Sequence, residues 1–427
     1  MTSPAQGSCP VPHATAAAPF NRSAVVPLSG PRFHTDRNSL YREIRRDHGP
    51  VAAVELIGGI PAWLVLGYRE MHQVTSSPEL FPRDVSLWNQ WPNIPPDWPL
   101  LPMVGTPMPS IYFTAGAEHR RHLAMVEPAL ESVDNFELRR VAEGLADQLI
   151  DAFCGRGTAD LVADFAEPLP VLVLAGLLGI PEVEGPGLAR AMKVMADGGA
   201  DAQTAHLQFM QYMQHLLAMK KAAPGDDLVS RMLAQPGQFT DEEYVNDLMA
   251  VTAAGHLPTA DWLINSVRLM LTDDRFAAAL GGGRRSVDQA MNEVLWEDSP
   301  NSILAGRWAA RDTRLADTQI RAGDLVLLGL AAANTDPHVR QSVGDGINSG
   351  NNAHFAFSHG EYRCPFPAQQ IAETVARTGI EVLLDRLPDI DLAVPAASLV
   401  RRPSPFLCGM TSLPVVFTPV RALGGFQ

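Results

Sequence analysis

The most informative part of this 427-residue chain is the stretch Phe357-Ser-His-Gly-Glu-Tyr-Arg-Cys364-Pro-Phe-Pro367. A turn-forming Ser-His-Gly leads into Cys364, and residues 368–384 behind it are compatible with a helix. The N-terminus of a helix stabilises a thiolate through its dipole and its free amides. The pattern therefore predicts a metal-binding cysteine, although a cysteine taken alone is more often a small buried hydrophobic residue.

The spacing Phe-x-x-Gly-x-x-x-Cys resembles the haem-binding loop of the cytochrome P450 family, in which the cysteine thiolate is the proximal iron ligand. The resemblance covers residues 35–420 and implies a mainly α fold with small β-sheets and a long central helix that crosses the haem. It implies haem b, iron protoporphyrin IX, as the cofactor, with Cys364 as the metal ligand and Phe357 in the cofactor-binding loop. Residues 31–427 should form a single haem-thiolate domain, preceded by a mobile arm over residues 1–30.

Composition excludes several classes of protein. Hydrophobic residues make up 46% of the chain and charged residues 19%, as is ordinary for an enzyme. The net charge of −14 argues against binding to nucleic acid or to anionic lipid. The four cysteines have neither zinc-finger nor disulfide-framework spacing. Because no signal-peptide pattern and no apolar run of about 18 residues is present, we expect a cytoplasmic protein without membrane contact.

Two local patterns predict particular elements. The segments Val51–Ile57 and Ala62–Gly67, separated by Gly58-Gly-Ile-Pro61, predict a β-hairpin. Thr240-Asp-Glu-Glu243 is a capping box and predicts the start of a helix that runs to Leu271. Such a helix would be about 48 Å long at 1.5 Å per residue. In the resembled family, a helix of this length crosses the haem.

The middle of this helix holds Ala254-Gly-His-Leu-Pro-Thr259, which is similar to the family's oxygen-groove pattern Ala-Gly-x-acid-Thr-Thr. Leucine stands in place of the acid and proline in place of the first hydroxyl, so the resemblance implies a groove without its proton-relay side chains. The proline should also bend the helix, because it removes one backbone hydrogen bond. The groove positions are Gly255, Leu257, Pro258 and Thr259, the last a substitute hydroxyl only if the helix is locally rotated.

A second departure lies in Met291-Asn-Glu-Val-Leu-Trp296, where the family carries Glu-x-x-Arg. Glu293 matches the family's glutamate, and Trp296 replaces the arginine. The arginine that usually completes this ion-pair network is not evident in Val343–Asn352. We therefore expect the network to be absent or rebuilt, with other donors for Glu293, because an unpaired buried charge is strongly destabilising.

The resemblance assigns three residues to the haem propionates. His119 matches the family's histidine, near the start of a helix predicted over residues 118–130. Leu123 stands where the family has an arginine, so propionate binding on this side should be weaker or use a neighbouring arginine. Arg307 matches a second arginine of the family, and Tyr362 replaces a histidine two residues before the cysteine.

The resemblance implies that the stretch from residue 83 to 114 roofs the substrate pocket. It holds seven prolines and three tryptophans with few charges, so it cannot form a regular helix. A long loop inside a compact enzyme is usually functional, although a packed surface loop is the alternative. The turn 404–407 should dip into the same pocket. The predicted pocket residues are Trp88, Trp91, Ala254, Ile303, Leu304 and Phe406.

The cysteine loop also predicts how the thiolate is tuned. Backbone amides just after the ligand normally donate hydrogen bonds to the sulfur. Pro365 and Pro367 have no N–H, so of these three positions only Phe366 can donate. Fewer hydrogen bonds should leave a more electron-donating sulfur and a lower reduction potential.

These features predict a haem-thiolate enzyme that uses O₂ to oxidise an apolar, aromatic small molecule of secondary metabolism. Without a proton relay, oxidative radical coupling is favoured slightly over hydroxylation, with tryptophan-containing cyclic dipeptides as a possible substrate class by analogy. Ordinary monooxygenation, a non-catalytic haem protein and a haem-free helical scaffold are the alternatives. Electrons should come from a ferredoxin and a ferredoxin reductase, because the chain shows no flavin or nicotinamide fingerprint.

Overall fold

The computed structural model describes residues 25–105, 107–181, 184–197, 201–273, 276, 285–340 and 351–424. Most of the predicted N-terminal arm, up to residue 24, lies outside the described residues, as does most of the 343–352 segment. The predicted mainly α fold with small sheets is confirmed. None of the described helices is both long enough and apolar enough to cross a membrane.

Five strands form the main sheet, in the order β1-β2-β3-β8-β5. They are β1 (Val26–Pro27), β2 (Val51–Leu56), β3 (Ile60–Val65), β8 (Leu325–Leu328) and β5 (Leu304–Trp308). The predicted hairpin is confirmed, because β2 and β3 pair antiparallel from Val51 opposite Val65 to Leu56 opposite Ile60. Strand β3 pairs parallel with β8, and β8 antiparallel with β5. The smaller sheets contain β4 (Thr158–Asp160), β9 (Asp391–Leu392) and β10 (Pro414–Val416), and β6 (Thr313–Leu315) with β7 (Thr318–Ile320).

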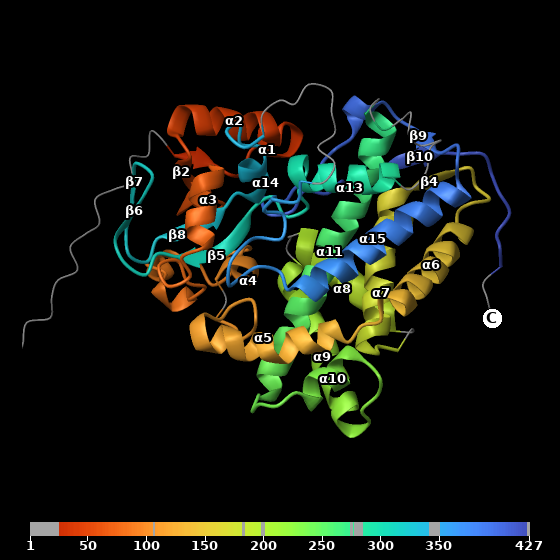
Figure 1. Cartoon of the computed structure of the whole chain (residues 1–427), viewed down its shortest axis with the longest axis horizontal. Helices are drawn as coiled ribbons and strands as arrows, with labels where there is room; N and C mark the ends of the chain where they lie inside the picture. The colour runs from red at the N-terminus through yellow and green to blue at the C-terminus, as the bar shows by residue number, and fades with distance from the viewer. Residues whose placement is uncertain are drawn as a thin grey trace, which may run out of the picture.

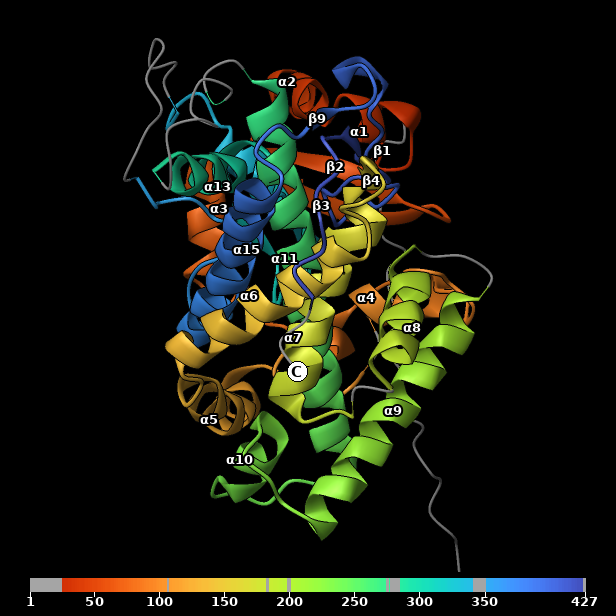
Figure 2. The same cartoon turned by 90° about the vertical axis from the view of Figure 1, so that its right-hand side faces the viewer.

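Helices make up most of the remaining body, with one core cluster among them and two more around the main sheet. In Figure 1 the main sheet lies on the left and α6, α7 and α15 on the right, with α11 between them; Figure 2 shows α8 and α9 side by side. The helices are α1 (Pro31–Thr35), α2 (Arg37–His48), α3 (Tyr68–Thr75), α4 (Leu101–Val104), α5 (Gly116–Glu131), α6 (Asn135–Asp151), α7 (Pro168–Leu178), α8 (Gly185–Asp197), α9 (Ala202–Ala222), α10 (Leu228–Ala234), α11 (Asp241–Thr272), α13 (Arg285–Glu297), α14 (Leu330–Asn334) and α15 (Phe366–Arg386).

The long central helix is α11, with 32 residues, and it ends one residue beyond the predicted Leu271. Its capping box is complete: the Thr240 hydroxyl accepts the N–H of Glu243 at 3.2 Å, and the Glu243 carboxylate accepts the N–H of Thr240 at 2.7 Å. Pro258 lies inside the helix. The helix packs against α7, α9, α13 and α15, so it gives the molecule a rigid axis against which a site can be built.

Candidate active site

A cavity of about 650 Å³ lies beside the middle of α11. Its walls come from α11, from the segment between α4 and α5, from α7 and from two loops near the C-terminus, and most of them are apolar. Five of the six residues from Ala254 to Thr259 line the cavity, all but His256, and Cys364 lines it as well. The cysteine loop and the groove of α11 therefore meet in one space, as the resemblance implied.

The loop that carries Cys364 is fixed by close backbone packing. Gly360 has a φ of +75°, and a Cβ at this position would lie 2.1 Å from the carbonyl oxygen of Thr75, so only glycine fits. The Cys364 amide donates to the carbonyl of Phe357 at 3.0 Å, and Gln369 donates to the carbonyl of Cys364 at 2.7 Å. Helix α15 begins two residues later, at Phe366. The sulfur is thus presented to the cavity by a rigid turn.

Burial raises the pKa of the Cys364 thiol to about 12 and outweighs the opposing effect of Arg83. Without a bound cation, the thiol therefore keeps its proton at neutral pH. A metal ion at the sulfur would displace that proton, because a coordinating thiol is deprotonated outright. The position suits a metal ligand and does not suit a free nucleophile, which needs a lowered pKa.

Two buried guanidinium groups lie close to the ring of Tyr362. Arg307 is 1% exposed, and its guanidinium lies 4.4 Å from the ring centre of Tyr362. Arg83 donates to the Tyr362 carbonyl at 3.0 Å and lies 4.7 Å from the ring centre of Tyr112. Burial lowers the pKa of both arginines, that of Arg307 well below its usual value.

Neither guanidinium contacts a carboxylate among the described residues. Nε and Nη2 of Arg307 and Nε of Arg83 have no hydrogen-bond partner there. Buried cations are normally paired, so the pair Arg83 and Arg307 forms a ready site for an anionic ligand. Arg83 was not among the predicted site residues. Its signal was a lone arginine at the start of a stretch with few other charges.

His119 and Tyr362 connect this site to the cysteine loop. Nδ1 of His119 lies 2.9 Å from the carbonyl oxygen of Ile111, and Nε2 lies 3.2 Å from that of Glu361. The rings of His119 and Tyr362 are 4.8 Å apart. Burial lowers the pKa of His119, so the ring is neutral at physiological pH. The Tyr362 hydroxyl accepts the N–H of Gly116 at 3.4 Å.

The groove of α11 offers no acidic side chain to the cavity at the predicted positions. Leu257 and Pro258 line the wall, and the side chain of Thr259 is buried. His256 points elsewhere, because its Nε2 lies 3.0 Å from the carbonyl oxygen of Glu167. Asp261, one turn beyond Leu257, is 2% exposed and is not among the lining residues.

The predicted pocket residues divide into two groups. Ala254, Leu304 and Phe406 line the cavity, the last from the predicted turn 404–407. Contrary to prediction, Trp88, Trp91 and Ile303 are not among the lining residues and pack in the core cluster of the main sheet. Trp88 is 2% exposed and packs edge-on or tilted against other indoles, because burying these large rings against one another removes more apolar surface from water. The loop forms the wall through Met108, Ile111, Tyr112 and Phe113 instead.

The ion-pair network around Glu293 is rebuilt. Glu293 is 2% exposed and pairs with Arg340, which also contacts Glu297 at 3.1 Å. The Trp296 indole donates to the carbonyl of Asn351 at 2.9 Å, and its ring lies 5.9 Å from the Arg340 guanidinium. The partner arginine thus lies three residues before the segment Val343–Asn352 in which the family pattern would place it.

Comparison with known proteins agrees with this geometry. No family model matches the chain. Cytochrome P450 107B1 of Saccharopolyspora erythraea is 28% identical over 400 residues, which cover 90% of this chain and 95% of that protein. The cytochrome P450 monooxygenase PikC of Streptomyces venezuelae is 29% identical over 411 residues, covering 92% and 94%. The solved structure of CYP154C4 from Streptomyces sp. ATCC 11861 matches with a TM-score of 0.83 at 27% identity, over 92% and 98% of the two chains.

The chain is a cytochrome P450. It is therefore an oxidoreductase of the monooxygenase type with haem b as its cofactor. The residues of this P450 fit that group: Cys364 would supply the sulfur ligand from the cavity lining, and Arg83 and Arg307, which have no carboxylate partner among the described residues, would bind its two propionates. When bound, the haem supplies the oxygen-activating chemistry, and a thiolate ligand favours cleavage of the O–O bond.

Proposed function

We propose that this cytochrome P450 oxidises an apolar, aromatic small molecule of secondary metabolism, with Cys364 as the proximal iron ligand. The observation that carries the proposal is the large apolar cavity between the cysteine loop and the groove of α11. One relative supports the metabolic setting by its name, the polyketide biosynthesis cytochrome P450 PksS of Bacillus subtilis, which is 28% identical over 306 residues.

Two polar side chains in the cavity wall suggest what the substrate carries. Asn246 is 7% exposed, and its Nδ2 has no hydrogen-bond partner among the described residues. His206 lines the same cavity, and its Nδ1 is likewise without a partner there. A buried donor without an acceptor is unfavourable, so a substrate carbonyl that accepts a hydrogen bond from Nδ2 of Asn246 would be favoured. This requirement fits an aromatic molecule with amide carbonyls, such as a tryptophan-containing cyclic dipeptide.

For the reaction, we propose oxidative coupling through substrate radicals. Leu257 and Pro258 cannot pass a proton, and general acid–base help is worth typically about 10²–10⁴-fold in rate. A reaction that abstracts hydrogen from an aromatic N–H or O–H and joins the radicals makes smaller demands on such a relay. Hydroxylation is the second candidate, because relatives such as the vitamin D(3) 25-hydroxylase of Pseudonocardia autotrophica carry that name.

Labelled oxygen separates the two reactions. Turnover under ¹⁸O₂ with ferredoxin, its reductase and candidate aromatic substrates is expected to give a product without the label. One labelled oxygen atom in the product would rule out coupling and favour hydroxylation. We place this reaction in the cytoplasm, with the ferredoxin and its reductase as separate electron donors.

A further inference from the structure

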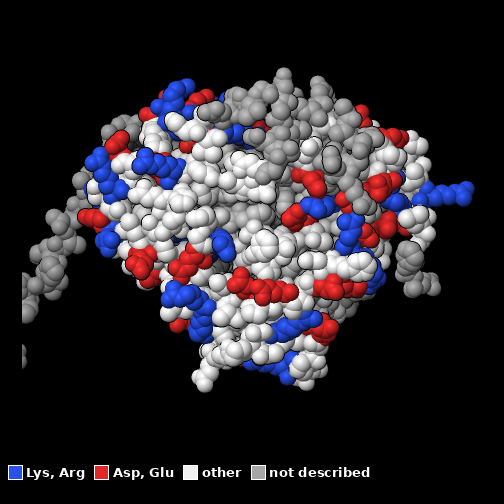
Figure 3. Space-filling model, in the orientation of Figure 1, with Lys and Arg blue, Asp and Glu red and all other residues white. Residues whose placement is uncertain are grey.

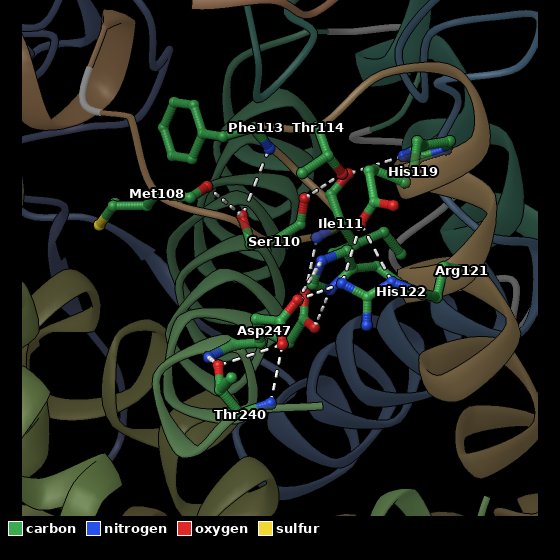
Figure 4. Close-up of polar contacts among 12 residues, drawn as sticks. Met108, Ser110, Ile111, Phe113, Thr114, His119, Arg121, His122, Thr240 and Asp247 are labelled. Atoms are coloured by element: carbon green, nitrogen blue, oxygen red, sulfur yellow. Dashed lines mark hydrogen bonds and ion pairs between the residues drawn. The ribbon is translucent and has the colours of Figure 1, made fainter. Parts of the chain in front are cut away.

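His122 of α5 and Asp247 of α11 form a buried pair beside the cavity. Neither side chain is exposed, and Nδ1 of His122 lies 2.5 Å from Oδ2 of Asp247. Figure 4 shows the pair beneath the segment that carries Met108 to Thr114. Nothing in the proposed haem site or oxygen groove uses either residue, so the pair needs an explanation of its own.

The second carboxylate oxygen of Asp247 holds the cavity wall. Oδ1 accepts the N–H of Ile111 at 2.6 Å. The carbonyl oxygen of Ile111 lies 2.9 Å from Nδ1 of His119, whose Nε2 lies 3.2 Å from the carbonyl oxygen of Glu361. A hydrogen bond therefore ties α11 to the wall, and Figure 4 shows the residues from Asp247 to His119. The ring of His119 lies between the carbonyl oxygens of Ile111 and Glu361, and because a neutral ring has one N–H, it donates to one of the two at a time.

This part of the wall is a short turn between α4 and α5. The carbonyl oxygen of Ser110 accepts the N–H groups of Phe113 and Thr114 at 3.2 and 3.1 Å. Arg83 also reaches it and donates to the carbonyl of Tyr112 at 3.4 Å, a longer bond than that from Ile111 to Asp247. Short turns of this kind open easily unless something rigid holds them. Asp247 supplies that hold from α11, which packs against α7, α9, α13 and α15.

A metal ion does not explain the cluster. Glu118, His122 and Glu243 offer ligand atoms within 4.8 Å of one another, and Nε2 of His122 lies 3.8 Å from Glu243. However, the guanidinium of Arg121 binds the carboxylates of both Glu118, at 2.9 Å, and Glu243. The position of a cation is therefore taken by Arg121, and Asp247 faces the cavity wall instead.

We propose that Asp247 is a positioning residue that fixes the 110–113 wall of the substrate cavity. His122 orients the carboxylate so that one oxygen faces the N–H of Ile111. Burial raises the pKa of Asp247, and the hydrogen bond to His122 opposes that effect, so the two side chains depend on each other. The consequence for substrate selection rests on the proposed function, whereas the anchoring itself needs neither haem nor substrate.

Hydrogen exchange measures the anchoring directly. In the wild-type protein, the amide of Ile111 should be protected far more than the amides of exposed turns. Asp247→Leu removes the acceptor and should speed exchange of the 108–114 peptide by about tenfold or more, because bonds to charged groups are the stronger class. Asp247→Asn keeps a side-chain oxygen in place and should restore most of the protection.

Thr252→Val is the matched control. Thr252 is also fully buried on α11, and its hydroxyl donates to the carbonyl of Leu248 at 2.6 Å without touching the wall. In the Thr252→Val protein, the rate of hydrogen exchange over residues 108–114 should stay near that of the wild type. An equal increase in both variants would mean general loosening and overturn the proposal. So would an unprotected Ile111 amide in the wild type, a result that needs no variant to fold.

A ligand titration tests whether the anchored wall contributes to ligand selection. With haem-loaded protein, the Kd for 4-phenylimidazole should rise about tenfold in Asp247→Leu at unchanged haem content. An unchanged Kd together with faster exchange would overturn the role in ligand selection. If the protein held no haem at all, the proposed function would fail, and the exchange result would still stand or fall by itself.

Discussion

Arg83 and Arg307 are the residues whose surroundings say most about how the haem would be held. The sequence pattern could point to Arg307, because its place in the chain resembles the family, but the role of Arg83 depends on Tyr112 and Tyr362, distant in sequence. Trp88, Trp91 and Ile303 were misplaced for the same reason. Composition shows that a loop is aromatic, while only the packing decides which rings face the cavity.

The two arginines should have opposite effects on the empty and the loaded protein. Arg307→Met removes a buried charge without a described carboxylate partner, so the haem-free protein should gain stability by roughly 1–3 kcal/mol in thermal unfolding. The loaded variant should release haem about tenfold faster to an apo-globin acceptor, because a charge-assisted bond is lost.

His119→Ala and Arg386→Met are the controls. His119→Ala should lose less haem than Arg307→Met, since His119 already faces two backbone carbonyls. Arg386 binds Asp147 and Asp151, so Arg386→Met should destabilise the haem-free protein. If Arg307→Met destabilised the haem-free protein as much as Arg386→Met does, the Arg307 charge would not be unpaired in that protein, and the prediction would be wrong.

Asp261 makes stability depend on pH. Burial raises its carboxyl pKa to about 7, and Arg402, 3.9 Å away, opposes the shift. The folded state therefore favours the protonated acid, so this contribution to stability is complete below the ordinary carboxyl pKa of about 4 and is lost as the pH rises to about 7. Thermal unfolding at pH 5 and pH 8 should show a larger drop in the wild type than in Asp261→Asn. An identical drop in both proteins would refute this assignment.

Helix α11 shows which parts of an element can be predicted from sequence. Its start and its length followed from Thr240, Glu243 and the apolar pattern, because capping is a local interaction. The hairpin of β2 and β3 was predictable for the same reason. The pairing of Glu293 with Arg340 was not, since an ion pair between distant residues leaves no fixed spacing in the sequence.

The groove of α11 can be given back the two relay side chains. Leu257→Asp combined with Pro258→Thr should not increase turnover of the native substrate, and it should divert product toward hydroxylation. The physical reason is that a proton relay serves oxygen insertion. Coupling instead needs a substrate radical that lasts long enough to react before oxygen is inserted into it. Product ratios by mass spectrometry measure the effect.

Pro258→Ala is the control for helix shape, because it returns a backbone N–H without adding a hydroxyl. It should leave the product ratio unchanged. If the double variant only accelerates formation of the wild-type product, the groove is an impaired relay and is not adapted to coupling.

At the scale of the whole molecule, the surface carries both basic and acidic side chains, although the net charge is negative. On the face that carries α5 and α15, basic and acidic side chains are interspersed around a broad uncharged area (Figure 3). Near Cys364, Phe366 is 59% exposed and Arg363 is exposed, while Arg120 pairs with Glu361 at 2.9 Å. The local surface thus combines an apolar contact with cations that an acidic electron donor could meet.

Reduction by an acidic ferredoxin should slow as salt rises, because exposed charges are screened over about 10 Å at 0.1 M. Arg363→Gln should slow the reaction by a few-fold at low salt. Arg314→Gln, on β6 far from the cysteine loop, should have no effect (Figure 1). Stopped-flow reduction rates across a salt series provide the measurement. Rates independent of salt would exclude charge-assisted docking at this face.

The absorption spectrum of the reduced, CO-bound protein tests most directly whether Cys364 binds the haem iron. The wild type should bind one haem per chain and show the red-shifted Soret band of a thiolate-ligated haem. Cys364→His should move the band to the position of histidine-ligated haem, while Cys154→Ala, at a buried cysteine outside the cavity lining, should leave it unchanged. A thiolate-type band that persists in Cys364→His would contradict the assignment.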